Sequence, residues 1–281
     1  MATISGATRL VAVIGDPARH SLSPAIHNAA FAACGLDWVY LAFDVARGHA
    51  LDALAAMRVL DIAGYSVTMP HKTDVAAGVD ERTTAASALA AVNCVINDHG
   101  VLVGDNTDGE GFLRGLHTDT GLDAAGRRCV VLGAGGAARA VIHALGRAGA
   151  SEVIVVNRSA AAAERAAGLG GAVGRAAGPE AVAHADLVVN ATPLGMRAYS
   201  PSAMPCDPAL VAPGAVVVDL IYDPLETPWL AALRARHVQV SNGLSMLVHQ
   251  AALQFERWTG TDAPVAVMRA AVHGLLVGPT P

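Results

Sequence analysis

A single lysine, Lys72, stands out among the residues of this sequence that could do chemistry. The chain has 19 basic residues, and all except Lys72 are arginines. A coding bias toward arginine explains why lysine is rare, but not why one lysine is present. A guanidinium does not deprotonate in proteins, whereas the pKa of a partly desolvated lysine can approach neutrality. Lys72 is therefore a candidate catalytic residue.

Three polar clusters accompany Lys72 at the ends of expected strands and helices, where crevices form in α/β folds. They are residues 21–24 (Ser-Leu-Ser-Pro), residues 66–72 (Ser-Val-Thr-Met-Pro-His-Lys), and Asn93 with residues 105–109 (Asp-Asn-Thr-Asp-Gly). Singly they are typical of a helix cap, a strand terminus and an Asx turn. Together they supply hydroxyls, an amide, carboxylates and an ammonium, which favours a substrate site.

A glycine-rich turn follows an expected strand and opens an expected helix. It has the pattern G-x-G-x-x-A and consists of Gly133, Ala134, Gly135, Gly136, Ala137 and Ala138. The first glycine permits a tight turn and the second lets the backbone approach a pyrophosphate. The helix N-terminus offers free N–H groups to that anion. The pattern in this context predicts nucleotide binding, and the alternative is an ordinary βα turn.

The end of the next expected strand indicates which dinucleotide is bound. An NAD site usually carries Asp or Glu there for the ribose 2′-hydroxyl, but this sequence has Asn157 and Arg158. A neutral donor and a cation suit a 2′-phosphate, so we expect NADP (NADPH) rather than NAD. A solvated arginine at a strand end is the alternative for Arg158.

Short β-rich runs alternate with alanine-rich helical stretches along the chain, which predicts the α/β class with parallel sheets. In the first part we expect strands at residues 10–14, 39–44, 64–67 and 92–97 and helices at 24–34, 50–59 and 72–77, with Ser23 as cap of the first helix. Further on we expect strands at 129–132, 153–156, 187–190, 216–220 and 238–240 and helices at 109–118, 137–147, 246–258 and 265–276.

This pattern predicts two domains. An N-terminal α/β substrate domain would comprise residues 1–107 and 244–281, with the C-terminal helices packing back on it. A Rossmann-type NADP-binding domain would comprise residues 108–243.

Composition excludes several classes of protein. Apolar residues make up 53% of the 281 residues and mean hydropathy is +0.42, which excludes a disordered chain. The net charge of −5 has the wrong sign for binding phosphate backbones, so we expect no nucleic acid partner. No targeting segment or membrane span is evident, and the four cysteines lack C-x-x-C spacing, so we expect a soluble cytoplasmic protein with reduced thiols. No histidine spacing indicates a metal, and we expect a monomer or homodimer.

Taken together, the motifs resemble those of the shikimate dehydrogenase family, nearly end to end. Besides the residues above, the resemblance rests on residues 91–93 (Ala-Val-Asn), 190–196 (Asn-Ala-Thr-Pro-Leu-Gly-Met), 219–222 (Asp-Leu-Ile-Tyr) and 246–250 (Met-Leu-Val-His-Gln). The resemblance implies an NADP-dependent oxidoreductase that interconverts 3-dehydroshikimate and shikimate in chorismate and aromatic amino acid biosynthesis.

The resemblance also implies roles for individual residues. Lys72 and Asp108 would be the catalytic pair. The residues that would contact substrate are Ser21, Ser23, Thr68, Asn93, Asp108, Tyr222 and Gln250. The residues that would line the cofactor site, besides the glycine-rich turn, are Asn157, Arg158, Thr192, Gly243 and Met246.

The chemistry of ketone reduction agrees with these roles. A hydride goes to carbon and a proton to the developing alkoxide, so the site needs a positioned acid. Lys72 would act as that donor or as a fixed positive charge. Desolvation would lower its pKa and the Asp108 carboxylate would raise it. His71 is a rival acid with a better-matched intrinsic pKa, although neighbouring residues tend to point in opposite directions.

Three departures from the family pattern bear on specificity. Ser66 stands where many relatives have Asn, and Ser245 where a glycine is frequent. Residues 160–163 are all alanine, although a second basic residue often follows the Asn-Arg pair within a few positions. Quinate or aminoshikimate as substrate, NAD as cofactor, and a catalytically silent NADP-binding sensor are the alternatives.

Overall fold

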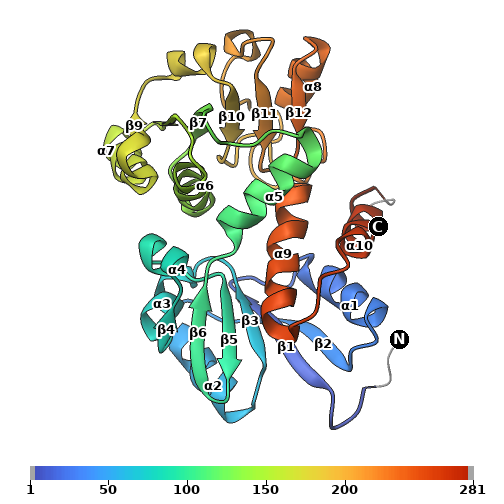
Figure 1. The fold of residues 1–281 in the computed structure, drawn as a ribbon. Coiled ribbons are helices and arrows are strands. Elements are labelled where there is room, and N and C mark those ends of the chain that lie inside the picture. Colours follow the sequence, from blue (N-terminus) through green and yellow to red (C-terminus); the bar gives the residue numbers. More distant parts are fainter. Residues whose placement is uncertain (1–3, 278–281) are drawn as a thin grey trace. The chain divides into compact units, whose positions relative to one another are not determined.

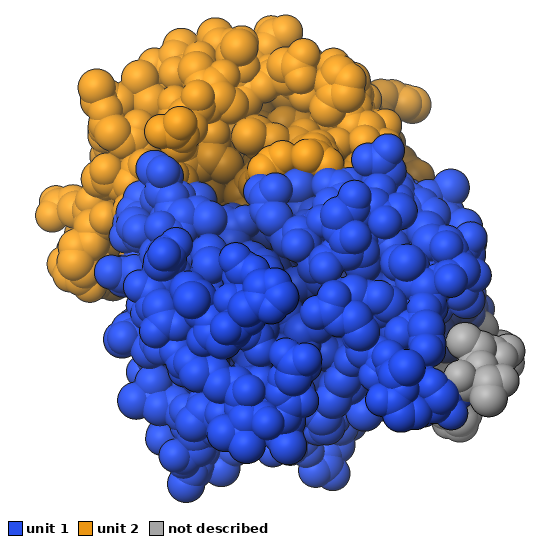
Figure 2. Space-filling model, turned by 60° about the horizontal axis from the view of Figure 1, so that its bottom comes forward, with its two compact units in different colours: residues 1–107, 250–281 blue, residues 108–249 orange. Residues whose placement is uncertain are grey.

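The computed structural model describes residues 4–277, which form two compact units (Figure 2). Unit 1 comprises Met1–Thr107 and Gln250–Pro281, and unit 2 comprises Asp108–His249. The return of the chain to unit 1 falls inside helix α9 (Leu244–Thr259), whereas we expected it at residue 244, where this helix begins.

Unit 1 contains a six-stranded sheet with the order β2-β1-β3-β5-β6-β4 in the described part of the chain (Figure 1). Its strands are β1 (Arg9–Gly15), β2 (Trp38–Asp44), β3 (Gly64–Val67), β4 (Glu81–Arg82), β5 (Cys94–Asp98) and β6 (Val101–Asp105). β1 pairs in parallel with β2 and β3, but β5 runs antiparallel to β3 and β6. The expectation of a wholly parallel sheet was therefore wrong here.

A tight hairpin joins β5 to β6 and accounts for their antiparallel pairing. Its loop between β5 and β6 is His99-Gly100, and both residues have positive φ, 51° and 93°. Two left-handed residues match the twist of a two-residue hairpin. The Gly100 N–H also donates to Asn97 Oδ1 at 2.8 Å. The sequence analysis missed this turn, and with it β4, β6 and the short helix α4.

Helices cover the sheet of unit 1. They are α1 (Ser23–Ala33), α2 (Ala50–Val59), α3 (Lys72–Gly78), α4 (Thr84–Leu89), the end of α9, and α10 (Val265–Val277). α10 packs on α1, and the Trp258 indole of α9 donates to the Val95 carbonyl at 3.0 Å. The expected return of the C-terminal helices to the first domain is thus confirmed.

Unit 2 contains a second six-stranded sheet, parallel throughout its described pairs, with the order β12-β11-β10-β7-β8-β9. Its strands are β7 (Arg128–Leu132), β8 (Glu152–Val156), β9 (Gly174–Ala176), β10 (Leu187–Asn190), β11 (Val216–Asp219) and β12 (Gln239–Ser241). Counted within the unit, this is the Rossmann order 3-2-1-4-5-6. Its helical elements are α5 (Asp108–Thr120), α6 (Gly136–Arg147), α7 (Ala160–Ala167), α8 (Pro228–Ala235), η1 (Gly168–Val173), η2 (Pro179–His184) and η3 (Pro208–Leu210).

Alternating residues of the strands in unit 2 face two different cores. Cys129 and Val131 pack with residues of α5, α6 and α7, whereas Val130 and Leu132 pack with Trp229 and its neighbours on α8. A strand that is buried on both faces has a continuous apolar sequence. This explains why the strands of unit 2 were recognisable from sequence.

The α/β class and the Rossmann-type second part are thus confirmed. No helix within residues 4–277 combines the length and apolarity that crossing a membrane would require.

His27 of α1 is a polar residue in the apolar part of unit 1. Its ring is fully buried and stacks on Tyr40 with centroids 4.5 Å apart, and Trp258 lies 5.2 Å away. Neither ring nitrogen has a hydrogen-bond partner within the described residues. Burial lowers the pKa of His27 from 6.5 to about 3, because the imidazolium would be desolvated.

We predict that His27 makes the protein acid-sensitive. The unfolded chain binds a proton at His27 below about pH 6.5 while the folded chain stays neutral, so stability is lost as pH falls from 6.5 toward 3. At pH 4.5 the loss is about 3 kcal/mol, two pKa units at 1.36 kcal/mol each. Denaturant titrations of wild type and His27→Phe between pH 7 and 4.5 measure it.

The matched control is His99→Asn, which removes a fully exposed imidazole from a left-handed position that Asn tolerates. It should follow the wild-type pH dependence, whereas His27→Phe should have a flatter one. Parallel curves for wild type and His27→Phe would show that His27 does not carry the effect.

Candidate functional site

In unit 1 the predicted polar residues lie at neighbouring strand ends. Thr68 follows β3, and its carbonyl accepts from the His71 N–H at 3.0 Å. Lys72 begins α3, and its carbonyl accepts from the Val92 N–H at 2.9 Å. The Asn93 carbonyl in turn accepts from the Val67 N–H at 2.8 Å. These backbone bonds bring Thr68, Lys72 and Asn93 together.

The side chain of Asn93 is buried and fixes the start of the segment after β6. Its Oδ1 accepts from the Thr107 N–H at 2.8 Å, and its Nδ2 lies 3.0 Å from Thr107 Oγ1. The Thr107 hydroxyl also reaches the Gln250 carbonyl at 3.1 Å. Asn93 and Gln250, both predicted substrate residues, are therefore joined through Thr107.

Gln254, one turn after Gln250 on α9, completes this cluster and was not predicted. Its Nε2 lies 2.9 Å from Gln250 Oε1, 3.2 Å from the Asn93 carbonyl and 3.4 Å from Thr107 Oγ1. Its Oε1 accepts from the Ser66 hydroxyl. The Gln254 amide is 2% exposed, so these bonds replace water.

Tyr40 extends the network to Ser23. Its hydroxyl donates to Ser66 Oγ at 2.6 Å and also hydrogen-bonds the side chain of Ser23. Burial raises the pKa of Tyr40, and the two serine hydroxyls partly offset this effect. Tyr40 therefore stays a neutral phenol that links Ser23 with Ser66.

Ser23 does not cap α1 as expected. The capping position is occupied by Leu22, whose side chain makes no capping hydrogen bond. Ser23 is the first helical residue, and Pro24 follows it. Ser21 Oγ instead accepts from the Ser23 N–H at 3.2 Å, as a capping side chain would. The Ser23 hydroxyl is thereby free to join the Tyr40 network.

In unit 2 the glycine-rich turn has the form that a pyrophosphate needs. Gly133 has φ of 115°, a conformation that other residues rarely adopt, and its N–H donates to the Val156 carbonyl at 2.8 Å. A β-carbon built on Gly135 or Gly136 meets no atom within 4 Å. α6 begins there without a side-chain cap, so its first N–H groups suit an anion. The turn fits a dinucleotide.

Two further strand ends lie beside this turn. β7 pairs with β8 and β10, and β10 with β11, with Leu132, Val156, Asn190 and Asp219 in register. Thr192 follows β10, and its N–H and hydroxyl both donate to Asn190 Oδ1, at 3.0 and 2.7 Å. Asn157 and Arg158 follow β8, the former half-buried and the latter exposed. Thus the predicted cofactor residues share one edge of the sheet.

Asp219 fixes the loops at this edge and was not predicted as a functional residue. Its carboxylate accepts from Asn190 Nδ2 at 2.9 Å, from Thr227 Oγ1 at 2.8 Å and from the Ile221 N–H at 3.2 Å. Burial raises the pKa of Asp219 to about 6, and these hydrogen bonds partly offset it. Asp219 thereby positions the loops of Thr192 and Tyr222.

Gly243 and Met246 lie beside the chain that carries Tyr222. The Gly243 N–H donates to the Ile221 carbonyl at 2.9 Å, and a β-carbon on Gly243 would collide with the Leu220 carbonyl. Met246 follows one turn into α9 and packs on the core of unit 2. Tyr222 is half-buried, and burial raises its pKa.

Asp108 is 8% exposed and begins α5 directly after Thr107, at the limit of the two units. Its first-turn position suits a carboxylate, because the helix N-terminus carries a partial positive charge. Within residues 4–277, no three His, Cys, Asp or Glu side chains are grouped so that they could hold a metal ion.

Comparison with known proteins relates these features to a family. The chain matches the model of the shikimate dehydrogenase substrate binding domain over residues 13–95, that of shikimate / quinate 5-dehydrogenase over 117–195, and that of the shikimate 5′-dehydrogenase C-terminal domain over 243–273. It is 46% identical to a shikimate dehydrogenase (NADP(+)) of Moorella thermoacetica, over 95% of this chain and 94% of that protein. The chain belongs to the shikimate dehydrogenase family.

Solved structures of this family share the fold. Shikimate 5-dehydrogenase from Thermus thermophilus, in complex with NADP(H) and shikimate, has a TM-score of 0.88 and 38% identity, over 94% of this chain and 98% of that one. Quinate dehydrogenase from Corynebacterium glutamicum, in complex with NAD, has a TM-score of 0.87 and 34% identity, over 95% and 99%. The fold alone does not separate these substrates.

The structure shows the partners of the two serines that depart from the shikimate dehydrogenase pattern. The Ser66 hydroxyl donates to Gln254 Oε1 of α9. Ser245 is buried, and its hydroxyl donates to Asp119 Oδ1 at 2.6 Å, while Ser241 donates to Oδ2 of the same carboxylate. Each of these serine hydroxyls thus hydrogen-bonds a side chain from another element.

We predict that Gln254→Ala lowers the free energy of unfolding by about 1–3 kcal/mol, because it leaves the buried Ser66 hydroxyl and the half-buried Gln250 amide without this partner. Chemical denaturation measures the change. Gln239→Ala is the control, since it removes an exposed amide whose one side-chain hydrogen bond within residues 4–277 is to the Thr120 carbonyl, and should stay within about 0.5 kcal/mol of wild type. An equally small effect of Gln254→Ala would contradict a stabilising role of the network.

Proposed function

We propose that this protein interconverts 3-dehydroshikimate and shikimate with NADP(H), a step of chorismate and aromatic amino acid biosynthesis. Full-length similarity to NADP-dependent shikimate dehydrogenases carries the proposal, since the 46% identical relative is covered over 94% of its length. An enzyme of this kind needs a site for a polyhydroxylated acid and a site for a dinucleotide. In this proposal unit 1 carries the first site and unit 2 the second.

The substrate would bind to the polar groups at the strand ends of unit 1. Ser21 and Ser23 at the start of α1 offer hydroxyls for the carboxylate. The residues that offer groups for the ring hydroxyls are Thr68, Asn93 and Gln250. Support comes from the buried network that holds Ser23, Asn93 and Gln250 in fixed orientations, because binding groups that are already ordered cost less entropy on binding.

Lys72 and Asp108 would be the catalytic pair. During reduction the Lys72 ammonium donates a proton to the alkoxide that forms at the ketone oxygen, or stabilises that oxygen as a fixed charge. The Asp108 carboxylate would hold the hydroxyl that is formed. The rival acid, His71, is fully buried, and its Nε2 lies 2.7 Å from the Val45 carbonyl.

The dinucleotide would bind along the sheet edge of unit 2, with its pyrophosphate at the glycine-rich turn and its 2′-phosphate near Asn157 and Arg158. Thr192 would border the cofactor, and Gly243, Met246 and Tyr222 would line the nicotinamide site. When bound, the reduced nicotinamide supplies the hydride. The open space at Gly135 and the uncapped start of α6 support this placement.

Quinate is the second candidate substrate, and the similarity to a quinate dehydrogenase favours testing it. Quinate differs from shikimate by hydration of one double bond, so the same hydroxyl and carboxylate contacts could serve both. A comparison of the oxidation rates of shikimate and quinate therefore shows which of them is the preferred substrate.

We predict that the protein reduces NADP+ with shikimate, faster than with quinate or aminoshikimate, and faster than it reduces NAD+. Absorbance of the reduced nicotinamide measures each rate. Lys72→Ala should lower kcat roughly 10²- to 10⁴-fold, the usual contribution of a positioned acid or base. Lys72→Arg separates the two roles, because arginine keeps the charge but does not titrate. Retained turnover indicates a fixed charge, and a loss comparable to Lys72→Ala indicates a proton donor.

Arg82→Ala is the matched control, since it removes an exposed cation from unit 1 without touching the strand-end cluster. It should keep wild-type turnover, and circular dichroism should show that every variant is folded. Full activity of Lys72→Ala would remove Lys72 from the mechanism. No turnover with any of the three acids would refute the proposed activity.

A further inference from the structure

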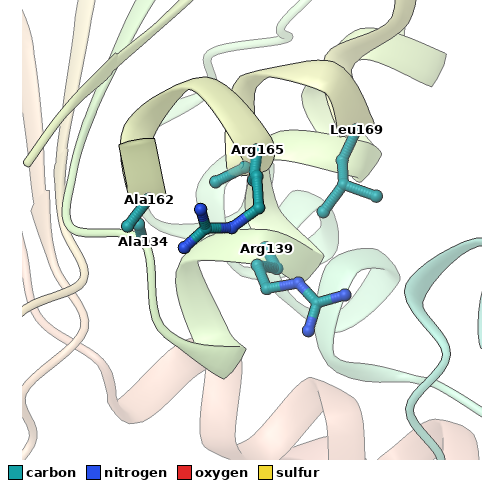
Figure 3. A pocket seen from close by; sticks show the side chains of 6 residues that line it. Ala134, Arg139, Ala162, Arg165 and Leu169 are labelled. Carbon is teal, nitrogen blue, oxygen red and sulfur yellow. The ribbon is translucent and has the colours of Figure 1, made fainter. Parts of the chain in front are cut away.

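A pocket in unit 2 lies next to the glycine-rich turn and contains two arginines (Figure 3). Its volume is about 370 Å³. The residues that line it come from the turn, α6, α7 and η1, and are Ala134, Arg139, Ala162, Arg165, Ala166 and Leu169. No acidic residue of the described chain lines it. Two cations and small side chains make it suitable for an anion.

The pocket continues the edge at which β8 ends. Asn157 and Arg158 follow β8, and Ser159 then caps α7, its hydroxyl accepting from the Ala162 N–H at 3.3 Å. In Rossmann folds the ribose 2′ position lies at the end of this second strand. Ala162 lines the pocket and hydrogen-bonds Ser159, so the pocket begins close to the expected position of a 2′-phosphate.

Arg165 is the cation best placed to reach that end of the pocket. It lies three residues after Ala162, which puts both on one face of α7. Figure 3 shows its guanidinium extending toward Ala134 and Ala162, whereas Arg139 extends in a different direction from α6. The Arg165 side chain is exposed, and its guanidinium makes no ion pair or hydrogen bond with any residue from 4 to 277. No protein carboxylate competes for it.

We propose that Arg165, acting with Arg158, binds the 2′-phosphate of NADP(H) and determines the preference for NADP over NAD. The proposal rests on the NADP-dependent function proposed above. A phosphate monoester is close to doubly charged at pH 7, and the guanidinium fork matches two of its oxygens. The open pocket beside Ala162 gives the long side chain room to turn toward the ribose.

The test measures binding, with no turnover. Isothermal titration calorimetry gives Kd values of 2′,5′-ADP and 5′-AMP, which differ by the 2′-phosphate, for wild type, Arg165→Ala and Arg147→Ala. Arg165→Ala should weaken 2′,5′-ADP binding roughly 10- to 100-fold, as for a lost hydrogen bond to a charged group, and change 5′-AMP binding less than about twofold. NADP+ and NAD+ should repeat this contrast.

Arg147→Ala is the matched control, because it removes an exposed arginine from the last turn of α6, at the end away from the glycine-rich turn. It should change neither affinity. In the double variant Ala162→Arg/Arg165→Ala, the new guanidinium on the same face of α7 should restore much of the affinity for 2′,5′-ADP.

The outcomes distinguish this proposal from the function on which it rests. If wild type prefers 2′,5′-ADP but Arg165→Ala keeps that preference, the role of Arg165 is refuted and NADP dependence stands. If Arg165→Ala weakens 5′-AMP equally, Arg165 does not act through the 2′-phosphate. If wild type binds both nucleotides equally, the NADP dependence itself is refuted, and this proposal with it.

Discussion

The carboxamide of Gln254 is the interaction on which the polar part of unit 1 depends. Its oxygen accepts from Ser66, which accepts from Tyr40, while its nitrogen donates toward Asn93, Thr107 and Gln250. A carboxamide carries an acceptor oxygen and a donor nitrogen side by side, so its orientation is fixed by its neighbours. The donors all run in one direction, from the phenol of Tyr40 through Ser66 to the amide, and such chains reinforce one another in a low-dielectric interior. Side chains from both ends of the sequence are ordered in this way.

A different constraint orders unit 2. Its parallel strands end in register, so residues that are far apart in sequence meet at one edge without any direct bond between their side chains. The loops that leave this edge are then fixed individually, by Asp219 between β10 and β11 and by close packing of Gly243 against Leu220. Burial disfavours the ionised form of Asp219 and so raises its pKa, and three hydrogen bonds to the carboxylate offset part of this effect.

Much of this could be predicted from sequence, because the relevant signals are local. The helix Ala50–Val59, the strand Leu187–Asn190 and the glycine-rich turn were expected where they lie, since periodicity and glycine spacing act over a few residues. The hairpin at His99-Gly100 was missed because its first left-handed residue is a histidine instead of Asn or Asp.

The side-chain hydrogen-bond networks could not be predicted from local sequence signals, because their members are far apart in the chain. Ser66 and Gln254 are 188 positions apart, and Asp119 and Ser245 are 126 apart. No local sequence pattern around Gln254 or Asp119 indicates that the side chain has a distant hydrogen-bond partner. The sequence around a serine at a strand end is likewise the same with or without such a partner. The same limit made Ser23 appear to be a helix cap, a local role, when its hydroxyl bonds Tyr40 from the next strand.

The contrast between His71 and Lys72 shows how geometry decides chemistry where intrinsic pKa values do not. An imidazole is the better-matched acid near neutral pH, and the two residues are adjacent in the chain. The start of α3 nevertheless turns His71 inward, where its ring is fully buried and bonds the Val45 carbonyl, and leaves Lys72 partly exposed beside Asn93. The His71 imidazole is thus enclosed in unit 1 and engaged with the backbone. The backbone bonds at Thr68 and Val92 fix the main chain of this segment, so that the lysine begins α3 at the strand-end cluster.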